Sequence, residues 1–439
     1  MTISIPELSL VVLIGPNGSE KSTFARKHFQ SEEVMCPHHC PRPGGNAEDH
    51  HGSVSLRVNE VRERVSQRLG RGQLTVVDAC STHPDERRDW VRLAKSCDCA
   101  AVAIVFNIPE RVCEEGHHAR DSGAVRAHLI NERWLPLRRS IKDLDREGFR
   151  DVFVMNSPEE VEAVHVERMS LPSDLKGEHG PFDIIGDIHG CCDELEELLL
   201  ELGYRHEMFA PGGPALVSGP IFVHPAGRKV IFVGDLVDRG PRILDTLRLV
   251  AGMVSFGSAL CVPGNHDMKL LRKLKGKNPH LTHGFALTVA EIDALPDGVR
   301  EIFCQELAVF LEGLVSHYGL DGGRLVVAHA GIKEEYQGRD SGRVREFALY
   351  GETTGETDEY GLPVRLDWAV NYRGSALVVY GHTPVAKPKW LNGTVNIDTG
   401  CVFGGSLTAL RYPEGECVSV KAKRVYCAPA RPFLADAKE

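Results

Sequence analysis

The chain has 439 residues, a formal net charge of −10 and a hydrophobic content of 42%. These values predict a folded protein of more than one domain, since a domain averages roughly 150 residues, and they exclude a broadly basic nucleic-acid-binding surface. The longest apolar run, Leu8 to Ile14, is too short to cross a bilayer, which needs about 20 residues. No basic stretch precedes an apolar one at the N-terminus. We therefore expect a cytoplasmic protein without membrane partners.

The first predicted strand, Leu8 to Ile14, leads into a glycine-rich loop and then into helical spacing from Lys21 to Phe29. Strand, loop and helix are the context of a phosphate-binding P-loop, in which backbone N–H groups surround phosphate oxygens. The residues that match this motif are Gly15, Gly18, Lys21, Ser22 and Thr23. Glu20 replaces the motif's second glycine and places a carboxylate where it would repel an anionic ligand. We therefore expect P-loop descent without competent binding of ATP and Mg²⁺.

The rest of the N-terminal segment alternates strands with helices. Residues 74–78 and 100–106 are apolar enough for buried strands, and residues 54–69 and 84–95 have amphipathic helical spacing. This alternation predicts a parallel sheet with helices on both faces. Five downstream arginines are equally compatible with a lid that clamps phosphate and with the solvated face of a helix. They are Arg120, Arg126, Arg133, Arg138 and Arg139.

From Phe182 onward, five blocks repeat one pattern: an apolar strand, a glycine, and then oxygen or imidazole side chains. Open α/β sheets place their sites at these carboxyl ends of strands. A single histidine after a strand is usually a packed residue, but five such blocks in series are not explained that way. The side chains in question are Asp187 and His189, then Asp235, Asp238 and Arg239, then Asn265 and His266, then His329, and finally His382.

The ligand types in these blocks predict two metal ions that share one carboxylate. We expect Asp187, His189 and Asp235 to hold the first ion. Asp235 would bridge to the second ion, which Asn265, His329 and His382 would complete. Mixed carboxylate, amide and imidazole ligands favour Mn²⁺ over Mg²⁺, with Ni²⁺, Fe or Zn²⁺ as alternatives. Two such ions lower the pKa of a water and neutralise the oxygens of a phosphate under attack.

Other polar residues in the same blocks suit roles around that centre. Arg239 offers a bidentate fork to phosphate oxygens, and His266 is placed to protonate a leaving oxygen. Asp238 is a candidate to orient His266. For Asp398, a supporting role near the metals and a plain turn are equally compatible with the sequence.

These blocks resemble the calcineurin-like binuclear metallophosphoesterases, which include protein Ser/Thr phosphatases and diadenosine tetraphosphatases. Together with the P-loop segment, the chain resembles the bacterial polynucleotide kinase–phosphatases of RNA repair over most of its length. The resemblance implies an α/β protein with a P-loop kinase-like parallel sheet in residues 1–160. A linker would occupy residues 161–180, a metallophosphoesterase sandwich residues 181–425, and a C-terminal tail residues 426–439.

The resemblance also implies an activity: removal of 2′,3′-cyclic, 3′- or 2′-phosphate from RNA 3′ ends, alongside RNA-repair partner proteins. In the kinase-like part, the family's general-base Asp falls on His38, its acceptor-binding Arg on Pro41 and one lid Arg on Gly116, while Arg120 persists. We therefore expect a pseudokinase. The metal centre is generic for phosphate esters, so a dinucleoside-polyphosphate or phosphoprotein phosphatase remains an alternative. A non-enzymatic scaffold that binds RNA ends is an alternative of another class.

Overall fold

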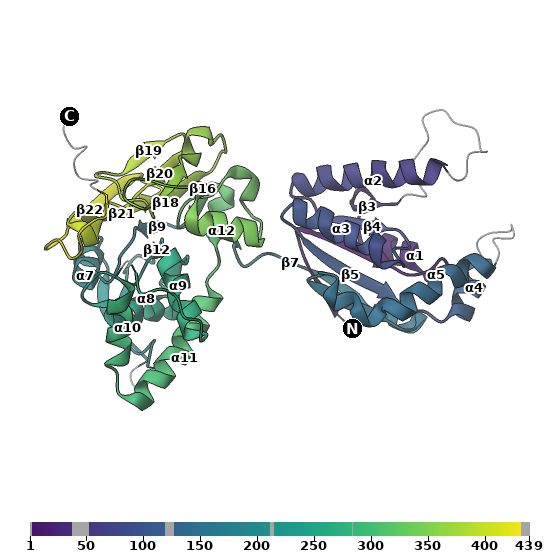
Figure 1. Cartoon of the computed structure of the whole chain (residues 1–439), viewed down its shortest axis with the longest axis horizontal. Helices are drawn as coiled ribbons and strands as arrows, with labels where there is room; N and C mark the ends of the chain where they lie inside the picture. Colours follow the sequence, from purple (N-terminus) through teal and green to yellow (C-terminus); the bar gives the residue numbers. More distant parts are fainter. Residues whose placement is uncertain (1, 37–51, 119–126, 211–214, 283, 432–439) are drawn as a thin grey trace. The chain divides into compact units, whose positions relative to one another are not determined.

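The computed structural model describes residues 2–36, 52–118, 127–210, 215–282 and 284–431 (Figure 1). The chain divides into two compact units. Unit 1 comprises Met1–Leu171 with Arg339–Ser341, and unit 2 comprises Pro172–Gly338 with Gly342–Glu439. Each unit combines strands and helices, which confirms the α/β class predicted from the sequence.

Unit 1 is built on a five-stranded parallel sheet whose strands lie in the order β3-β4-β2-β5-β6. Successive residues of β2 are buried on opposite faces, Val11 and Leu13 in one apolar cluster and Leu10 and Val12 in the other. A strand buried on both faces needs a continuous apolar run, which is what the sequence provides. The strands are β2 (Ser9–Ile14), β3 (Val34–Met35), β4 (Thr75–Asp78), β5 (Ala100–Phe106) and β6 (Asp151–Met155).

Helices cover both faces of this sheet. Side chains of α2, α3 and α5 pack into one apolar cluster, and those of α1, α4 and α6 pack into the other. A separate parallel pair, β1 (Thr2–Pro6) with β7 (His165–Met169), completes the unit. The helices are α1 (Lys21–His28), α2 (Gly52–Gly70), α3 (Pro84–Ser96), α4 (Glu110–His118), α5 (Ala127–Ser140) and α6 (Pro158–Ala163).

Unit 2 is a sandwich of two sheets, with strand orders β13-β12-β9-β21-β22 and β19-β20-β18-β15-β14-β8. An apolar cluster that includes Ile184, Ile231, Val327 and Val379 fills the space between them. The first sheet contains β9 (Phe182–Ile185), β12 (Lys229–Phe232), β13 (Ala259–Cys261), β21 (Ser406–Tyr412) and β22 (Glu416–Lys421). The second contains β8 (Asp174–Leu175), β14 (His317–Leu320), β15 (Leu325–Ala328), β18 (Leu377–Tyr380), β19 (Lys389–Leu391) and β20 (Thr394–Asn396).

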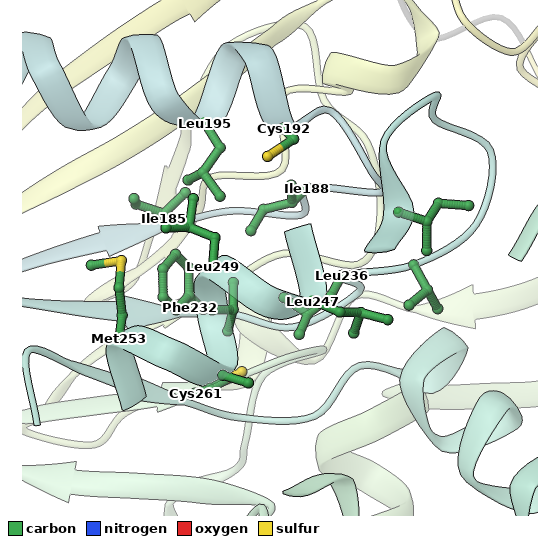
Figure 2. Packing of buried hydrophobic residues seen from close by; sticks show 14 of the residues in the cluster. Ile185, Ile188, Cys192, Leu195, Phe232, Leu236, Leu247, Leu249, Met253 and Cys261 are labelled. Atoms are coloured by element: carbon green, nitrogen blue, oxygen red, sulfur yellow. The ribbon is translucent and has the colours of Figure 1, made fainter. Parts of the chain in front are cut away.

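The largest apolar cluster lies on the outer face of the first sheet. Figure 2 shows Ile185 and Phe232 from the strands packed against Leu195, Leu247 and neighbouring helical side chains. Burying each such side chain contributes roughly 2 kcal/mol, so this packing holds the strand ends in place. The helices of the unit are α7 (Cys192–Glu201), α8 (Ile243–Phe256), α9 (Asn265–Leu274), α10 (Phe285–Asp293), α11 (Asp297–Gly313) and α12 (Gly342–Tyr350). Two hairpins complete it, β10 (Arg205–Phe209) with β11 (Gly219–Val223) and β16 (Glu352–Thr357) with β17 (Pro363–Leu366).

The segments predicted as linker and tail both contain ordered contacts. Residues 161–180 include β7 of unit 1 and β8 at the edge of the second sheet of unit 2. At the other end, the backbone N–H groups of Tyr426 and Cys427 both donate to the carbonyl of Val402. Both segments therefore form backbone hydrogen bonds within the folded units, which composition alone does not reveal. Across the described ranges, no helix is both long and apolar enough to cross a bilayer.

Candidate metal centre

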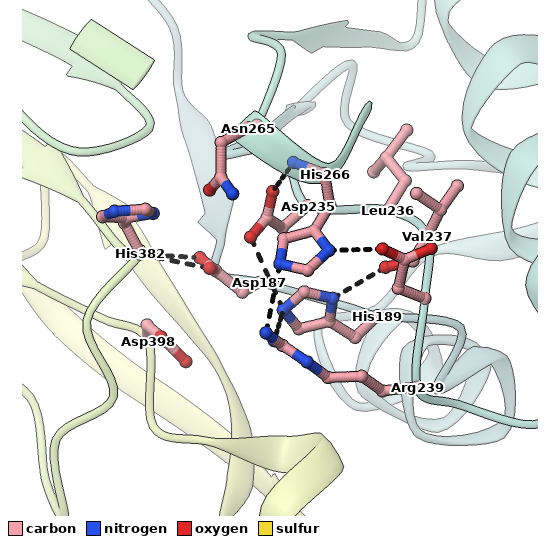
Figure 3. A network of polar contacts seen from close by, with 12 residues as sticks. Asp187, His189, Asp235, Leu236, Val237, Arg239, Asn265, His266, His382 and Asp398 are labelled. Carbon is pink, nitrogen blue, oxygen red and sulfur yellow. Dashed lines mark hydrogen bonds and ion pairs between the residues drawn. The ribbon is translucent and has the colours of Figure 1, made fainter. Parts of the chain in front are cut away.

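The predicted ligands of unit 2, together with Asp398, come together at the carboxyl ends of six strands, three from each sheet. In the first sheet β9, β12 and β13 run parallel, and they lead into Asp187 and His189, into Asp235, and into Asn265. In the second sheet β15, β18 and β20 run parallel, and they lead into His329, His382 and Asp398. The sandwich therefore brings residues that are far apart in the sequence to one edge (Figure 3).

Asp235 lies between two groups of ligand-type atoms and directs one oxygen at each. Its Oδ2 is 3.5 Å from Nε2 of His189, and its Oδ1 is 3.5 Å from Nε2 of His329. Within the described residues, three sets have side-chain ligand atoms that all lie within 4.8 Å of one another, and two of these sets include Asp235. These two sets are His189, Asp235 and His266, and Asp235, His329 and His382. This is the arrangement that a bridging carboxylate needs.

The second group, formed by Asn265, His329 and His382 beside Asp235, has the spacing of ligand atoms around one cation. Nε2 of His329 lies 2.9 Å from Nδ1 of His382 and 3.2 Å from Oδ1 of Asn265. Ligand atoms that each sit about 2.1 Å from a metal lie roughly 3 Å apart, so the observed distances fit. Nδ1 of His329 faces the carbonyl of Val233 at 3.0 Å, which directs its proton away from the centre.

The first group differs in one respect from the predicted ligand set, because the set within 4.8 Å contains His266 where Asp187 was expected. Asp187 lies beside this set, and both of its oxygens accept the backbone N–H of His382 at 3.1–3.2 Å. Nδ1 of His189 faces the carbonyl of Val237 at 2.7 Å, which leaves its Nε2 lone pair on the side of Asp235. Asp187 thus links the two groups through the backbone of the His382 loop.

Crowded carboxylates give the centre its electrostatic character. Burial, together with the nearby charges of Asp398 and Asp235, raises the pKa of Asp187. Burial and the charge of Asp235 likewise raise the pKa of Asp398, to about 7. Burial opposes ionisation of Asp235 too, but the surrounding imidazoles, His329 first among them, hold its pKa below the usual range. A site in which carboxylates repel one another is one that a cation stabilises.

Burial favours the neutral form of two of the histidines, and neutral imidazole is the form that binds a metal. Burial lowers the pKa of His189, and the guanidinium of Arg239 lowers it further. Burial also lowers the pKa of His382, with additional lowering from His329 and Arg365. Neutral imidazoles and an ionised carboxylate together form a donor set suited to Mn²⁺, Fe or Zn²⁺. The residues present therefore fit a pair of divalent cations.

Arg239 bridges two imidazoles at this centre (Figure 3). Its Nη1 donates to Nε2 of His189 at 2.6 Å, and its Nη2 donates to Nε2 of His266 at 3.1 Å. The guanidinium also lies over the ring of Phe403, 5.1 Å from its centroid. One lone pair cannot accept an N–H and bind a cation at the same time. Arg239 must therefore release His189 when a cation binds there, which frees its donors for phosphate oxygens.

His266 is oriented by a buried chain of hydrogen bonds. Its Nδ1 donates to Oδ2 of Asp238, whose other oxygen accepts the hydroxyl proton of Thr288. The backbone N–H of Asp238 donates back to the Thr288 hydroxyl at 3.1 Å. Nε2 of His266 is thereby turned toward the cavity, where a leaving oxygen would need a proton. Thr288 lies in α10, a segment without a motif, so its role was missed from the sequence.

Several centre residues adopt left-handed backbone conformations that side chains other than glycine rarely take. The φ angles are 47° for His189, 48° for Asp235, 76° for Asp238, 70° for Arg239 and 72° for His382. Such strain costs about 1–3 kcal/mol per residue and clusters at functional sites. Its concentration in these five residues indicates that the surrounding fold holds the loops in this geometry.

Two glycines of the motifs are required by close approach. A Cβ on Gly381 would lie 2.1 Å from Oδ1 of Asp187, and one on Gly240 would lie 2.0 Å from the carbonyl oxygen of His189. Asp267 is a further residue whose role the sequence analysis missed. Its two oxygens accept the backbone N–H groups of Leu236 and Gly264 at 2.9 and 2.8 Å, which ties the Asp235 loop to the start of α9. Its position three residues after Gly264 is the spacing of a helix-capping box, a signal that the sequence contained.

In unit 1 the P-loop residues are brought together, with one strained position. Glu20 has φ 69°, the left-handed conformation for which the motif uses glycine. Nζ of Lys21 donates to the carbonyl of Pro16 at 2.7 Å, and the hydroxyl of Ser22 donates to Asp78 at 2.6 Å. Gly15 and Gly18 lie in the loop before α1 and Thr23 in its first turn. A Cβ on Gly18 would lie 2.1 Å from the carbonyl oxygen of Cys113.

Part of the predicted kinase-like site cannot be placed. His38, Pro41, Arg120 and Arg126 lie outside the described residues. Gly116 lies in α4. Of the arginines proposed for a lid, Arg138 and Arg139 are exposed on α5, and Arg138 stacks on the ring of Trp134 at 4.9 Å. For these two residues, the solvated helix face is the alternative that the structure matches.

Comparisons with known proteins match both units. Residues 10–144 match the family described as AAA domain, and residues 180–386 match the family described as calcineurin-like phosphoesterase. A relative from Anoxybacillus flavithermus is 49% identical over 253 residues, which cover 57% of this chain and 99% of that protein. A relative from Geobacillus thermodenitrificans is 51% identical over 238 residues, which cover 54% of this chain and 93% of that protein. Both are named bis(5′-nucleosyl)-tetraphosphatase PrpE (asymmetrical).

Among solved structures, a putative diadenosine tetraphosphatase is 27% identical, with a TM-score of 0.39. That match covers 57% of this chain and 96% of the other.

Proposed function

The chain belongs to the calcineurin-like phosphoesterase family, and from this premise we propose that it hydrolyses dinucleoside tetraphosphates asymmetrically, leaving unequal numbers of phosphates on the two products. The observation that carries the proposal is a pair of ligand groups sharing Asp235 that opens on a cavity of about 760 Å³. Cavities of roughly 300–1,000 Å³ accommodate whole organic ligands rather than a single phosphate. The names of the relatives support the same substrate class.

The chemistry assigned to the centre follows from its residues. We assign the first cation to Asp187, His189 and Asp235, and the second to Asp235, Asn265, His329 and His382, with Mn²⁺ as the preferred metal. Two such cations would activate water and neutralise phosphate oxygens. Arg239, once released from the imidazoles, donates to the phosphate under attack. His266, held by Asp238, passes its Nε2 proton to the departing oxygen.

A direct comparison of substrates tests the proposal. Purified protein with Mn²⁺ is given diadenosine tetraphosphate, an RNA with a 3′-phosphate and a phosphopeptide, and products are separated by chromatography. We expect kcat/KM for diadenosine tetraphosphate to exceed the other two values at least tenfold, with mono- and triphosphate products. An equal preparation of Asp235→Asn controls for contaminating phosphatases. A higher value for the RNA or the phosphopeptide would overturn the assignment.

A second candidate function is the trimming of RNA 3′ ends, which was our first expectation from the sequence. The P-loop fold of unit 1 favours it, because that unit accompanies the phosphoesterase in the RNA-repair enzymes that the chain resembles. The relatives favour the dinucleoside substrate instead, and for this reason we rank RNA second. The same comparison, extended to a 2′,3′-cyclic phosphate end, distinguishes the two.

We also propose that unit 1 is a pseudokinase. Glu20 occupies the left-handed position of the missing glycine, and the ammonium of Lys21 is bound to the loop's own Pro16 carbonyl. The carboxylate opposes an anionic ligand at the point where phosphate would approach. We expect no transfer of γ-phosphate from ATP to a 5′-hydroxyl oligonucleotide, and measurable transfer would refute the proposal. Glu20→Gly tests the cause, since it should increase ATP affinity at least tenfold by calorimetry.

A further inference from the structure

The cavity at the metal centre extends well beyond the residues that would hold metals. One side is formed by centre residues such as His189, Asp235 and His266. Another is formed by the β16–β17 hairpin and its flanks, and a third by residues 427–431 of the C-terminal segment. That segment is anchored by Glu194, which accepts the backbone N–H of Lys423 at 2.9 Å and the hydroxyl of Tyr426 at 2.7 Å. The cavity walls formed by the hairpin and by the C-terminal segment are therefore ordered parts of the fold.

The charged side chains of those remote walls are paired, with one exception. Lys389 forms an ion pair with Asp367 at 3.0 Å, and Arg431 forms one with Asp358 at 3.7 Å. Glu352 is paired with Lys333 at 2.8 Å. Arg365 of β17 forms no ion pair with any described residue.

Arg365 is held in position without losing its charge. Its Nη1 donates to the backbone carbonyl of Tyr350, at the end of α12. A guanidinium carries five N–H donors, so most of them remain available to a ligand. The side chain is exposed to the cavity and to solvent. A neutral carbonyl partner orients the fork but leaves its positive charge uncompensated.

The two cavity arginines have different partners and come from different walls of the cavity. Arg239 donates to His189 and His266. Arg365 instead lines the cavity from β17 and is held by the carbonyl of Tyr350, outside the residues of the centre. A phosphate under attack at the metals, with His266 protonating its leaving oxygen, would have Arg239 beside it. Arg365, on another wall of the same cavity, would then be available to whatever else is attached to that phosphate.

We propose that Arg365 binds a phosphate group adjoining the one under attack, and so selects substrates with a chain of phosphates over simple phosphate monoesters. This inference rests on the proposed function and deepens it. A dinucleoside tetraphosphate offers adjoining phosphates, whereas an aryl monoester or a single 3′-phosphate does not. The bidentate match between guanidinium and phosphate accounts for the choice of arginine at this position.

The test compares two substrates that differ in adjoining phosphates. For the full-length protein with Mn²⁺, we take the ratio of kcat/KM for diadenosine tetraphosphate to kcat/KM for p-nitrophenyl phosphate. Arg365→Gln should lower this ratio about 10- to 100-fold, the range of one lost charge-assisted contact. Arg365→Lys, which keeps the charge but not the fork, should give an intermediate ratio. Lys389→Gln removes an equal charge from the same cavity at a residue already paired with Asp367, and should leave the ratio within twofold of wild type.

Each contrary outcome has a separate meaning. An unchanged ratio in Arg365→Gln, with wild type active on the dinucleotide, would overturn this inference alone. Equal losses on both substrates would also overturn it, by placing Arg365 at the phosphate under attack. A wild-type protein that hydrolyses p-nitrophenyl phosphate but no dinucleoside tetraphosphate would overturn the proposed function and this inference with it.

Discussion

The contacts of Arg239 depend on whether the imidazoles of the centre are occupied. Its two N–H contacts, 2.6 Å to His189 and 3.1 Å to His266, use the lone pairs of both imidazoles. A cation on His189 and a proton on Nε2 of His266 each displace one of these contacts. Arg239 thus contacts both imidazoles in this structure, and under the proposed function it would donate hydrogen bonds to phosphate once those imidazoles are occupied.

At the residue scale, we predict that the effect of His266→Ala depends on the leaving group. A general acid matters most when the departing oxygen is strongly basic, and its removal then costs about 10²- to 10⁴-fold in rate. We expect a loss of that size in kcat for an alkyl phosphate, and a loss at least tenfold smaller for p-nitrophenyl phosphate, whose leaving group needs no proton. His206→Ala, in the exposed part of β10, is the control. Equal losses on both esters would show that His266 acts in another way.

At the scale of elements, the loops after the strands are held by close backbone approach. Gly381 separates β18 from His382 and lies against the carboxylate of Asp187. Asp267 connects the start of α9 to the Asp235 loop. These contacts join elements from both sheets, so the geometry of the centre depends on the sandwich as well as on each loop.

We predict that Gly381→Ala weakens metal binding. Its new Cβ would lie 2.1 Å from Oδ1 of Asp187 and 3.3 Å from Cβ of Asp398, so the buried carboxylate of Asp187 would have to move. The Mn²⁺ concentration for half-maximal hydrolysis should rise at least tenfold. Gly298→Ala is the matched control, because a Cβ there has nothing within 4 Å and the residue lies in the first turn of α11. An unchanged metal requirement in Gly381→Ala would contradict the role assigned to this glycine.

A second element-scale prediction concerns Asp321, in the turn between β14 and β15. Hydrogen bonds from Arg324, Tyr412 and His179 hold the pKa of Asp321 well below its usual value. A folded-state pKa below the unfolded one, about 3.9, gives stability that is present above that pH and lost as the pH falls through the folded value.

Asp321→Asn should therefore lower the urea midpoint of unit 2 at pH 7, and its difference from wild type should narrow progressively below about pH 4. Asparagine tolerates the φ of 50° at this position, so the backbone is not the cause. Intrinsic fluorescence during urea unfolding at several pH values measures the effect. A difference that persists unchanged down to pH 2 would contradict it.

At the scale of the whole molecule, the centre is supplied by unit 2 alone. Every predicted metal ligand belongs to Pro172–Gly338 or Gly342–Glu439, while the P-loop belongs to unit 1. The metal centre and the P-loop, which are the two phosphate-binding features suggested by the sequence, thus belong to units with separate hydrophobic cores. The acidic balance of the chain suits a site that recognises phosphate through cations and a few arginines.

We therefore predict that chelation abolishes hydrolysis and loosens unit 2 selectively. Without cations, the carboxylates of Asp187, Asp235 and Asp398 repel one another, so amide exchange should increase at the strand ends that carry them. Exchange in β2, β4 and β5 of unit 1 should not change. Adding Mn²⁺ at 100 times its Kd should restore about 2.7 kcal/mol to the opening free energy of those loops. Hydrogen–deuterium exchange with mass spectrometry checks both units at once, and equal changes in the two would contradict the prediction.

By itself, the sequence determined the α/β class, the P-loop context and the residues that would meet at the strand ends. These features are local: a buried strand is an apolar run, and the side chains after it follow directly in the chain. The replacement of the P-loop motif's second glycine by Glu20 could also be seen in the sequence, because the motif defines which position needs glycine.

Only the tertiary structure decided how those residues act on one another. Thr288 and Arg365 come from segments without a motif and reach the centre through the packing of α10 and the β16–β17 hairpin. The double contact of Arg239 and the left-handed loops are likewise set by elements distant in the chain. The physical reason is that the type of each metal-ligand side chain is a property of a single residue. Burial, charge pairing and hydrogen-bond partners arise only when the two sheets bring separate segments together.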